Sequence, residues 1–249
     1  MTYLEFQGVS HNYNGEQQVI HSLHLQVQEG EFVTLVGRSG CGKTTLLKMA
    51  AGLLTPDEGK VRIADKPVTK PQTQVGVVFQ APTLLEWQTV RENVLLPVSL
   101  VRKPTRADRE AADAYLERMG LALHADKYPA ELSGGQQSRV GIARALIREP
   151  SLLLMDEPFA ALDALTRESL QEDLLQLCRS KKITVLFITH DITEAVYLSD
   201  RVIVLHGGGI AGEYSVPLPD SRHYEMRYDS EFNRVCLAVR QAMEGGERK

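Results

Sequence analysis

Short, continuous apolar runs alternate along the chain with segments of helical periodicity. The runs expected to form buried strands are Glu31–Val36, Val75–Phe79, Leu152–Met155, Ile183–Thr189 and Arg201–Leu205. Helical patterns occur after several of them, at Thr44–Ala51, Ala164–Cys178 and Ile192–Leu198. Because strands without a polar face need cover on both sides, the alternation predicts an α/β fold with a mainly parallel sheet.

The two ends of the chain show other patterns. Leu4–Ser10 and His24–Val27 alternate loosely between apolar and polar residues, which suits strands of an N-terminal antiparallel β subdomain. Near the other end, Ser230–Met243 has helical periodicity. Its apolar positions are Phe232, Val235, Val239 and Met243. We expect a small terminal helix that packs on the domain.

The segment from about Thr89 to Arg148 breaks the alternation of strand and helix. Thr105 can cap a helix that runs to Gly120, and Ser133 can cap a second helix over Gln136–Ile147. The apolar face of the first helix consists of Ala112, Tyr115, Leu116 and Met119. We therefore expect an inserted α-helical subdomain.

These patterns give an expected division of a single domain, 1–249. The α/β core takes about 1–88 and 149–215, and the helical subdomain takes about 89–148. A C-terminal tail with its helix takes about 216–249.

Composition narrows the classes of protein. The net charge of −4 disfavours nucleic-acid binding, which depends on basic surface. No apolar stretch reaches the roughly 18–20 residues of a membrane span, and the first residues lack a signal-peptide pattern. Three cysteines, Cys41, Cys178 and Cys236, argue against a disulfide framework and have no metal-like spacing. We expect a soluble, cytoplasmic protein.

A phosphate-binding loop is predicted between the strand Glu31–Val36 and the helix that follows. Its residues are Gly37, Arg38, Ser39, Gly40, Cys41, Gly42, Lys43 and Thr44. Glycines let backbone N–H groups turn inward around phosphate oxygens, and the helix adds its positive N-terminal end. Lys43 would neutralise the β and γ phosphates, and the Thr44 hydroxyl would ligate Mg²⁺. The alternative is a glycine-rich turn, but the strand before and the helix after favour a phosphate site.

Polar residues end three of the predicted strands. Asp156 and Glu157 follow Leu152–Met155, where Asp156 would hold Mg²⁺ through water and Glu157 would polarise the attacking water. Gln80 and His190 end two other strands, so all four are expected at one sheet edge. Taken singly, these residues could be an acidic turn, a cap or surface residues.

The order of these motifs, with Leu132–Gln136 (Leu-Ser-Gly-Gly-Gln) between them, resembles ATP-binding-cassette (ABC) ATPases over nearly the full chain. The resemblance implies that Tyr13 stacks on adenine, that Gly37–Thr44 with Thr45 bind the phosphates, and that Gln80 contacts Mg²⁺ or water. It further implies that His190 senses the γ-phosphate. It assigns Ser133, Gly134, Gly135 and Gln136 to the signature loop, and Ala161, Leu162 and Asp163 to the D-loop, of which Asp163 is the expected site residue.

The same resemblance implies cofactors and partners. The family binds ATP with Mg²⁺, and two copies sandwich two ATP molecules head to tail, each signature loop contacting the partner's ATP. The run from Trp87 to Val94, Ala164–Arg167 and His223–Arg227 are similar to importers of the nitrate, sulfonate and taurine group. An importer subunit would act at the cytoplasmic face of the membrane with integral permease subunits and, indirectly, a substrate-binding protein.

Several alternatives stay open at this stage. The chain could instead drive a non-transport assembly, such as iron–sulfur cluster building or cell-envelope machinery, and the membrane partner would discriminate the two. A phosphate-loop kinase does not explain the signature loop. Trp87 could belong to the core or to a docking surface. The transported solute, the permease, the binding protein, the direction of transport and the nucleotide state are not determined by the sequence.

Overall fold

A computed structural model describes residues 1–13 and 17–245 in two compact units. The first unit comprises Met1–Gln72 and the chain from Leu175 onward, and the second comprises Thr73–Leu174. Residues 246–249 of the predicted C-terminal segment lie outside the described residues.

The first unit contains an antiparallel sheet near the N-terminus, as expected. β1 (Thr2–Tyr13) pairs antiparallel with β2 (Gln17–Gln28) and with β4 (Glu58–Ile63), and β5 (Lys66–Pro67) pairs with β4. The predicted strand segments Leu4–Ser10 and His24–Val27 lie within β1 and β2.

A second set of strands in this unit carries the parallel pairing. β3 (Phe32–Gly37) runs parallel to β8 (Thr184–Ile188) on one side and to β9 (Arg201–His206) on the other. β10 (Gly209–Ser215) pairs antiparallel with β9. Every residue of β3 and β8 is buried, which explains why both read as apolar runs without alternation.

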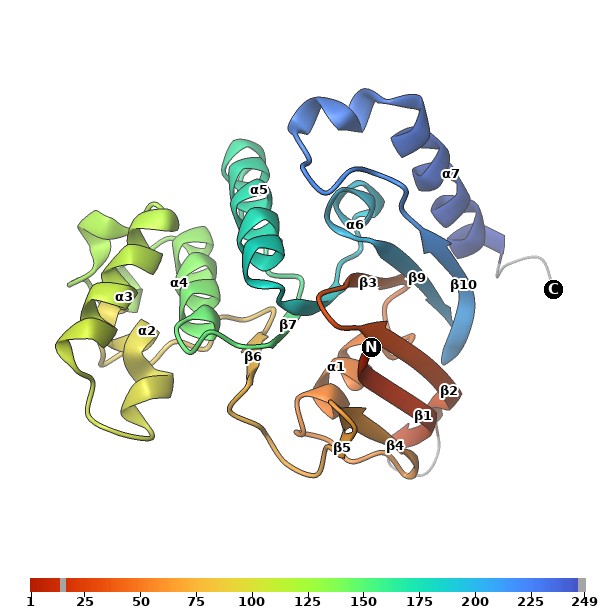
Figure 1. Cartoon of the computed structure of the whole chain (residues 1–249), viewed down its shortest axis with the longest axis horizontal. Coiled ribbons are helices and arrows are strands. Elements are labelled where there is room, and N and C mark those ends of the chain that lie inside the picture. The colour runs from red at the N-terminus through yellow and green to blue at the C-terminus, as the bar shows by residue number, and fades with distance from the viewer. Residues whose placement is uncertain (14–16, 246–249) are drawn as a thin grey trace. The chain divides into compact units, whose positions relative to one another are not determined.

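Helices pack on these strands. α1 (Lys43–Ala50) contacts β3, β4 and β8, and α6 (Ile192–Leu198) contacts β3 and β9. A short 3₁₀ turn, η3 (Tyr224–Tyr228), precedes α7 (Ser230–Gly245), which packs on α6, β9 and β10 (Figure 1). The predicted terminal helix is confirmed, and it buries Phe232, Val235 and Val239.

The second unit combines two parallel strands with a group of helices. β6 (Val75–Val78) pairs parallel with β7 (Leu152–Asp156). α2 (Val90–Ser99) contacts α3 (Arg106–Arg118) and α4 (Gly134–Leu146), which Figure 1 shows grouped together. The 3₁₀ turns η1 (Ala122–His124) and η2 (Pro129–Glu131) connect α3 to α4. α5 (Ala164–Lys181) begins in this unit.

Capping boxes fix where the helices of the second unit begin. Thr105 with Asp108 caps α3, and Ser133 with Gln136 caps α4, as the polar residues at these positions predict. Thr89 with Glu92 does the same for α2. The α4 helix begins at Gly134 and not at the expected Gln136, because the first helical residue directly follows the N-cap residue, Ser133.

Candidate functional site

The predicted phosphate loop connects β3 to α1 and needs glycine at two positions. Gly37 and Gly42 have φ of 155° and 100°. A Cβ on Gly37 would strike the Leu205 carbonyl oxygen, and one on Gly42 would strike the Ile20 side chain. The loop is therefore held against β9 and β2 at a distance that no other residue permits.

The side chain of Lys43 arches back across this loop. Its Nζ donates to the carbonyl oxygens of Gly37 and Arg38, at 2.7 and 2.9 Å, and lies 3.7 Å from Cys41 Sγ. Among the described residues no side chain caps α1, whose N-cap is Gly42, whereas α2, α3 and α4 all have capping boxes. The first amides of α1 and the Lys43 ammonium thus make a cationic cradle suited to an anion.

Tyr13 lies beside the helix that this loop opens. Its hydroxyl is 3.3 Å from Thr45 Oγ1, and its ring meets the ring of His11 edge-on, with 4.8 Å between centroids. Tyr13 is 42% exposed, so part of the ring remains available for stacking.

His190 follows β8, the parallel neighbour of β3. Leu35 pairs with Ile188 in the register, so His190 and the phosphate loop leave the sheet at the same edge. The next residue, Asp191, caps α6 by accepting from the amides of Thr193 and Glu194, at 2.8 and 3.1 Å. The structure therefore brings the phosphate loop, Tyr13 and His190 together within the first unit.

Gln80, Asp156 and Glu157 come together within the second unit. Val78 pairs with Met155 in the parallel register, so the residues after both strands emerge at one edge. Gln80 Nε2 donates to Glu157 Oε2 at 3.4 Å, and Asp156 is buried at 6% exposure. Glu157 has φ of 47°, a conformation that L-residues adopt at a cost.

The signature loop begins α4. The backbone N–H of Gln136 donates to Ser133 Oγ at 3.3 Å. In return, the backbone N–H of Ser133 donates to Oε1 of the Gln136 side chain at 2.8 Å. A Cβ on Gly135 would come within 2.9 Å of the Leu162 side chain and 3.0 Å of the Ala161 carbonyl oxygen. The glycines thus let this loop approach the D-loop closely.

The D-loop leads into α5. Asp163 Oδ1 accepts from the Thr166 amide at 3.0 Å, and this hydrogen bond lowers the pKa of the Asp163 carboxyl. Asp163 therefore remains an anion at neutral pH at the start of α5.

Three residues that sequence reasoning missed support these loops. Arg144, on α4, donates to the carbonyl oxygens of Pro82 and Thr83, which follow Gln80. Gln137 Nε2 donates to the Pro129 carbonyl oxygen at 3.0 Å. His124, on η1, lies against Gln136. The first two bond to main-chain carbonyls, so no spacing of residue types signals them.

Comparison with known proteins decides the family. The model of the family described as ABC transporter matches residues 20–160. The chain belongs to the ABC transporter family. It is an ATPase cassette that binds ATP, and the resemblance to ABC ATPases noted in its sequence is confirmed.

Two curated relatives and one solved structure are similar to this cassette. It is 42% identical to the aliphatic sulfonates import ATP-binding protein SsuB of Bacillus thuringiensis, over 93% of this chain and 91% of that protein. It is 46% identical to the bicarbonate transport ATP-binding protein CmpC of Synechocystis, over 84% of this chain and 32% of that protein.

The solved structure is a dimeric ATP-binding cassette in a post-hydrolysis state, bound to ADP and Pi. Its TM-score is 0.79 at 33% identity, and the match covers 89% of this chain and 100% of that one. This likeness confirms the α/β fold of a phosphate-loop ATPase.

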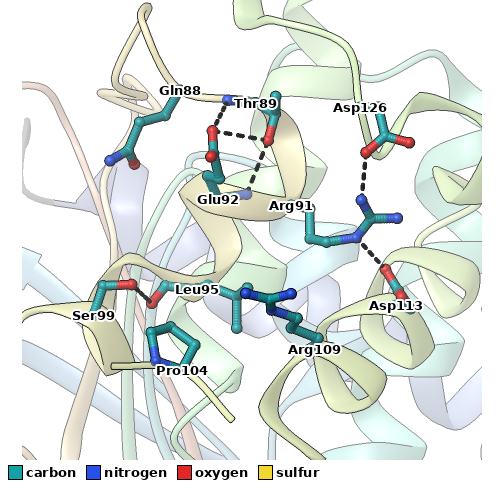
Figure 2. Close-up of a pocket in the computed structure, with 10 residues that line it drawn as sticks. All are labelled: Gln88, Thr89, Arg91, Glu92, Leu95, Ser99, Pro104, Arg109, Asp113 and Asp126. Atoms are coloured by element: carbon teal, nitrogen blue, oxygen red, sulfur yellow. Dashed lines mark hydrogen bonds and ion pairs between the residues drawn. The ribbon is translucent and has the colours of Figure 1, made fainter. Parts of the chain in front are cut away.

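A cavity of about 570 Å³ lies among the helices of the cassette's second unit, between α2 and α3 (Figure 2). Arg91 reaches into it and pairs with Asp113, at 2.7 Å, and with Asp126. Its other lining residues are Gln88, Thr89, Glu92, Leu95, Ser99, Pro104 and Arg109.

Trp87, next to the cavity-lining Gln88, is 74% exposed. The interpretation of Trp87 as a core residue is therefore wrong. Within residues 1–13 and 17–245, no helix has both the length and the apolar character that crossing a bilayer requires.

Proposed function

We propose that this chain is the ATP-hydrolysing subunit of an importer of the nitrate, sulfonate and taurine type, working as a head-to-tail dimer. The observation that carries the nucleotide part is the uncapped start of α1 beside the Lys43 ammonium. The importer part is supported by the identity to SsuB along most of both chains.

In this proposal the phosphate loop binds the ATP phosphates. The amides of Gly37–Thr44 and of Thr45 donate to phosphate oxygens, and Lys43 exchanges its carbonyl partners for the β and γ phosphates. Tyr13 stacks its exposed ring on adenine. Arg38 and Ser39 lie within the same loop.

Mg²⁺ fits the residues present. Thr44 is exposed at the start of α1, and Asp156 supplies one carboxylate. The Thr44 hydroxyl and the Asp156 carboxylate are oxygen donors, which Mg²⁺ prefers, and Mg²⁺ takes few protein ligands besides phosphate oxygens and water. Thr44, Asp156 and Gln80 would hold the ion, which would neutralise charge on the phosphates.

Hydrolysis is assigned to Glu157, Gln80 and His190. The Glu157 carboxylate accepts the proton of the attacking water, and the Gln80 amide, 3.4 Å away, holds that carboxylate in place. His190 contacts the γ-phosphate and reports its presence to α6, which begins two residues later.

A second copy of the chain completes each site. Ser133, Gly134, Gly135 and Gln136 bind the partner's γ-phosphate through the start of α4, and Asp163 crosses to the partner. The solved dimeric cassette supports this arrangement.

Permease subunits would dock on the second unit. The exposed Trp87 and the cavity between α2 and α3 offer an apolar anchor beside a charged groove for a short helix of the permease. The cassette would then lie on the cytoplasmic face of the membrane, and a substrate-binding protein would select the solute.

Co-purification and uptake test this function. The chain is coexpressed with the permease genes of its own genome, and ATP-driven uptake of sulfonates, nitrate and bicarbonate is measured in proteoliposomes. We expect a membrane complex whose uptake requires ATP and Lys43. If the active ATPase copurifies with no integral membrane protein and supports no uptake, the alternative is favoured, namely an ABC ATPase of a non-transport assembly.

A further inference from the structure

The side chain of Gln136 is held at both of its ends. Its Oε1 accepts from the Ser133 backbone N–H at 2.8 Å, and its Nε2 lies 3.2 Å from His124 Nε2. A backbone N–H can only donate, so the amide oxygen must face Ser133. The NH₂ group of Gln136 must therefore face His124.

This orientation fixes the protonation of the imidazole. Two N–H donors cannot form a hydrogen bond with each other, so His124 Nε2 must be unprotonated and must accept from the Gln136 NH₂ group. The neutral ring then carries its proton on Nδ1. That nitrogen is buried and has no hydrogen-bond partner among the residues that the structure describes.

We propose that His124 is a positioning residue for the signature loop, and that it does so only as the neutral, Nδ1-protonated tautomer. The proposal rests on the proposed function in one respect, namely that the signature loop binds ATP held by a second copy. Nothing in the geometry of His124 itself depends on that function.

Protonation of His124 would open the capping box. A proton on Nε2 would face the Gln136 NH₂ group, so either the amide turns over or the ring withdraws. If the amide turns over, a donor faces the Ser133 N–H and the bond to Oε1 is lost. The start of α4, with Gly134 and Gly135, would lose a constraint on its geometry.

The charged groups on neighbouring elements do not compensate an imidazolium. Among the described residues no carboxylate forms an ion pair with His124. Asp126, two residues on, is paired with Arg91 of α2, and Arg139 of α4 donates to the Met119 carbonyl oxygen after α3. Lys127, three residues on, is a further positive charge. A proton placed on His124 Nε2 would therefore act directly on Gln136.

Nitrogen NMR of the full, ¹⁵N-labelled chain tests the tautomer without any assay of function. At about pH 7.5, we expect the His124 ring to show a protonated Nδ1 and a bare Nε2. On acidification, the Ser133 amide signal should shift together with the His124 ring. A protonated Nε2 at neutral pH, or a Ser133 amide indifferent to the titration, overturns the proposal.

Kinetics of His124→Phe test its consequence. The variant keeps a planar ring but removes the acceptor, so turnover at about pH 7.5 should fall roughly 2- to 10-fold, the usual worth of one hydrogen bond. ATP binding to the isolated chain should be unchanged. Acidification should lower the turnover of this variant less than that of the unmodified chain, because the variant has no imidazole to protonate.

His24→Phe is the matched control, because His24 is exposed on β2. It should keep the turnover and the pH profile of the unmodified chain. An acid loss as large in His124→Phe as in the unmodified chain contradicts the proposal, since other groups would then account for it. If the chain hydrolyses no ATP at all, the proposed function fails, and the NMR measurement alone decides the role of His124.

Discussion

At the scale of single residues, Glu157 combines an unusual backbone with a paired side chain. Its φ of 47° is uncommon for a residue with a Cβ, and its carboxylate accepts from Gln80. Glu157→Gln preserves shape but cannot take a proton from water. We expect ATP binding to persist while turnover falls roughly 10²–10⁴-fold, with an ATP-bound dimer accumulating.

Phosphate release and size-exclusion chromatography with ATP measure these two effects. Glu172→Gln, an exposed change on α5, is the control and should behave like the unmodified chain. Near-normal turnover of Glu157→Gln would remove Glu157 from the role of general base.

Cys41 gives a second prediction at this scale. Its thiol lies in the phosphate loop, with Sγ 3.7 Å from Lys43 Nζ. Burial raises the pKa of Cys178 to about 12 and that of Cys236 to about 11, so both remain thiols at neutral pH. A small alkylating reagent should therefore modify Cys41 first, block ATP binding, and be slowed by MgATP.

Mass spectrometry of the alkylated peptides measures the rate at each cysteine. A Cys41→Ser chain should show no protected site. Labelling of Cys41 at the same rate with and without MgATP would contradict the prediction.

At the scale of elements, the sequence pattern predicted best where burial is complete. β3 and β8 are buried at every residue, so each reads as an unbroken apolar run. β4 was not predicted, because its first three residues are exposed and carry no apolar signal. α2 was not singled out either, since Pro97 interrupts its helical pattern.

The candidate site was likewise predictable from the sequence only in part. Its loops could be predicted because glycines and charged residues at strand ends have a local spacing that phosphate chemistry requires. Arg144, Gln137 and His124 could not, because each acts on a partner that only the folded chain brings near. Residue types at fixed spacing do not encode such contacts.

Arg144 gives a prediction for the link between α4 and the segment after Gln80. Its guanidinium donates to the carbonyl oxygens of Pro82 and Thr83, and burial lowers its pKa. Arg144→Met keeps most of the aliphatic stem but leaves both carbonyls without this donor. We expect the free energy of unfolding to fall by about 1–3 kcal/mol and turnover to fall with it, because Gln80 loses support.

Urea unfolding and steady-state ATPase assays check this expectation. Arg148→Met is the matched control, since the Arg148 side chain is exposed and its hydrogen bond to the Pro97 carbonyl oxygen is long, at 3.4 Å. Equal effects of the two substitutions would mean that Arg144 acts only through general surface charge.

At the scale of the whole molecule, the proposed coupling to a permease requires a surface of the cassette that another protein can contact. Trp87 is an exposed aromatic residue that directly precedes Gln88, a residue lining the α2–α3 cavity. An indole that is 74% exposed contributes little to the stability of the isolated chain. Truncation of Trp87 should therefore leave the fold intact, so that its effect on docking can be measured separately from stability.

Trp87→Ala should therefore leave the melting temperature and the ATPase of the isolated cassette nearly unchanged. In a complex with the permease, loss of an interface anchor worth about 2 kcal/mol should weaken association roughly 30-fold and abolish most of the partner-stimulated ATPase. Leu237→Ala, an exposed change on α7, is the control and should keep full stimulation. If Trp87→Ala and Leu237→Ala are stimulated alike by the permease, the partner docks elsewhere, and ATP closure is transmitted through a different surface.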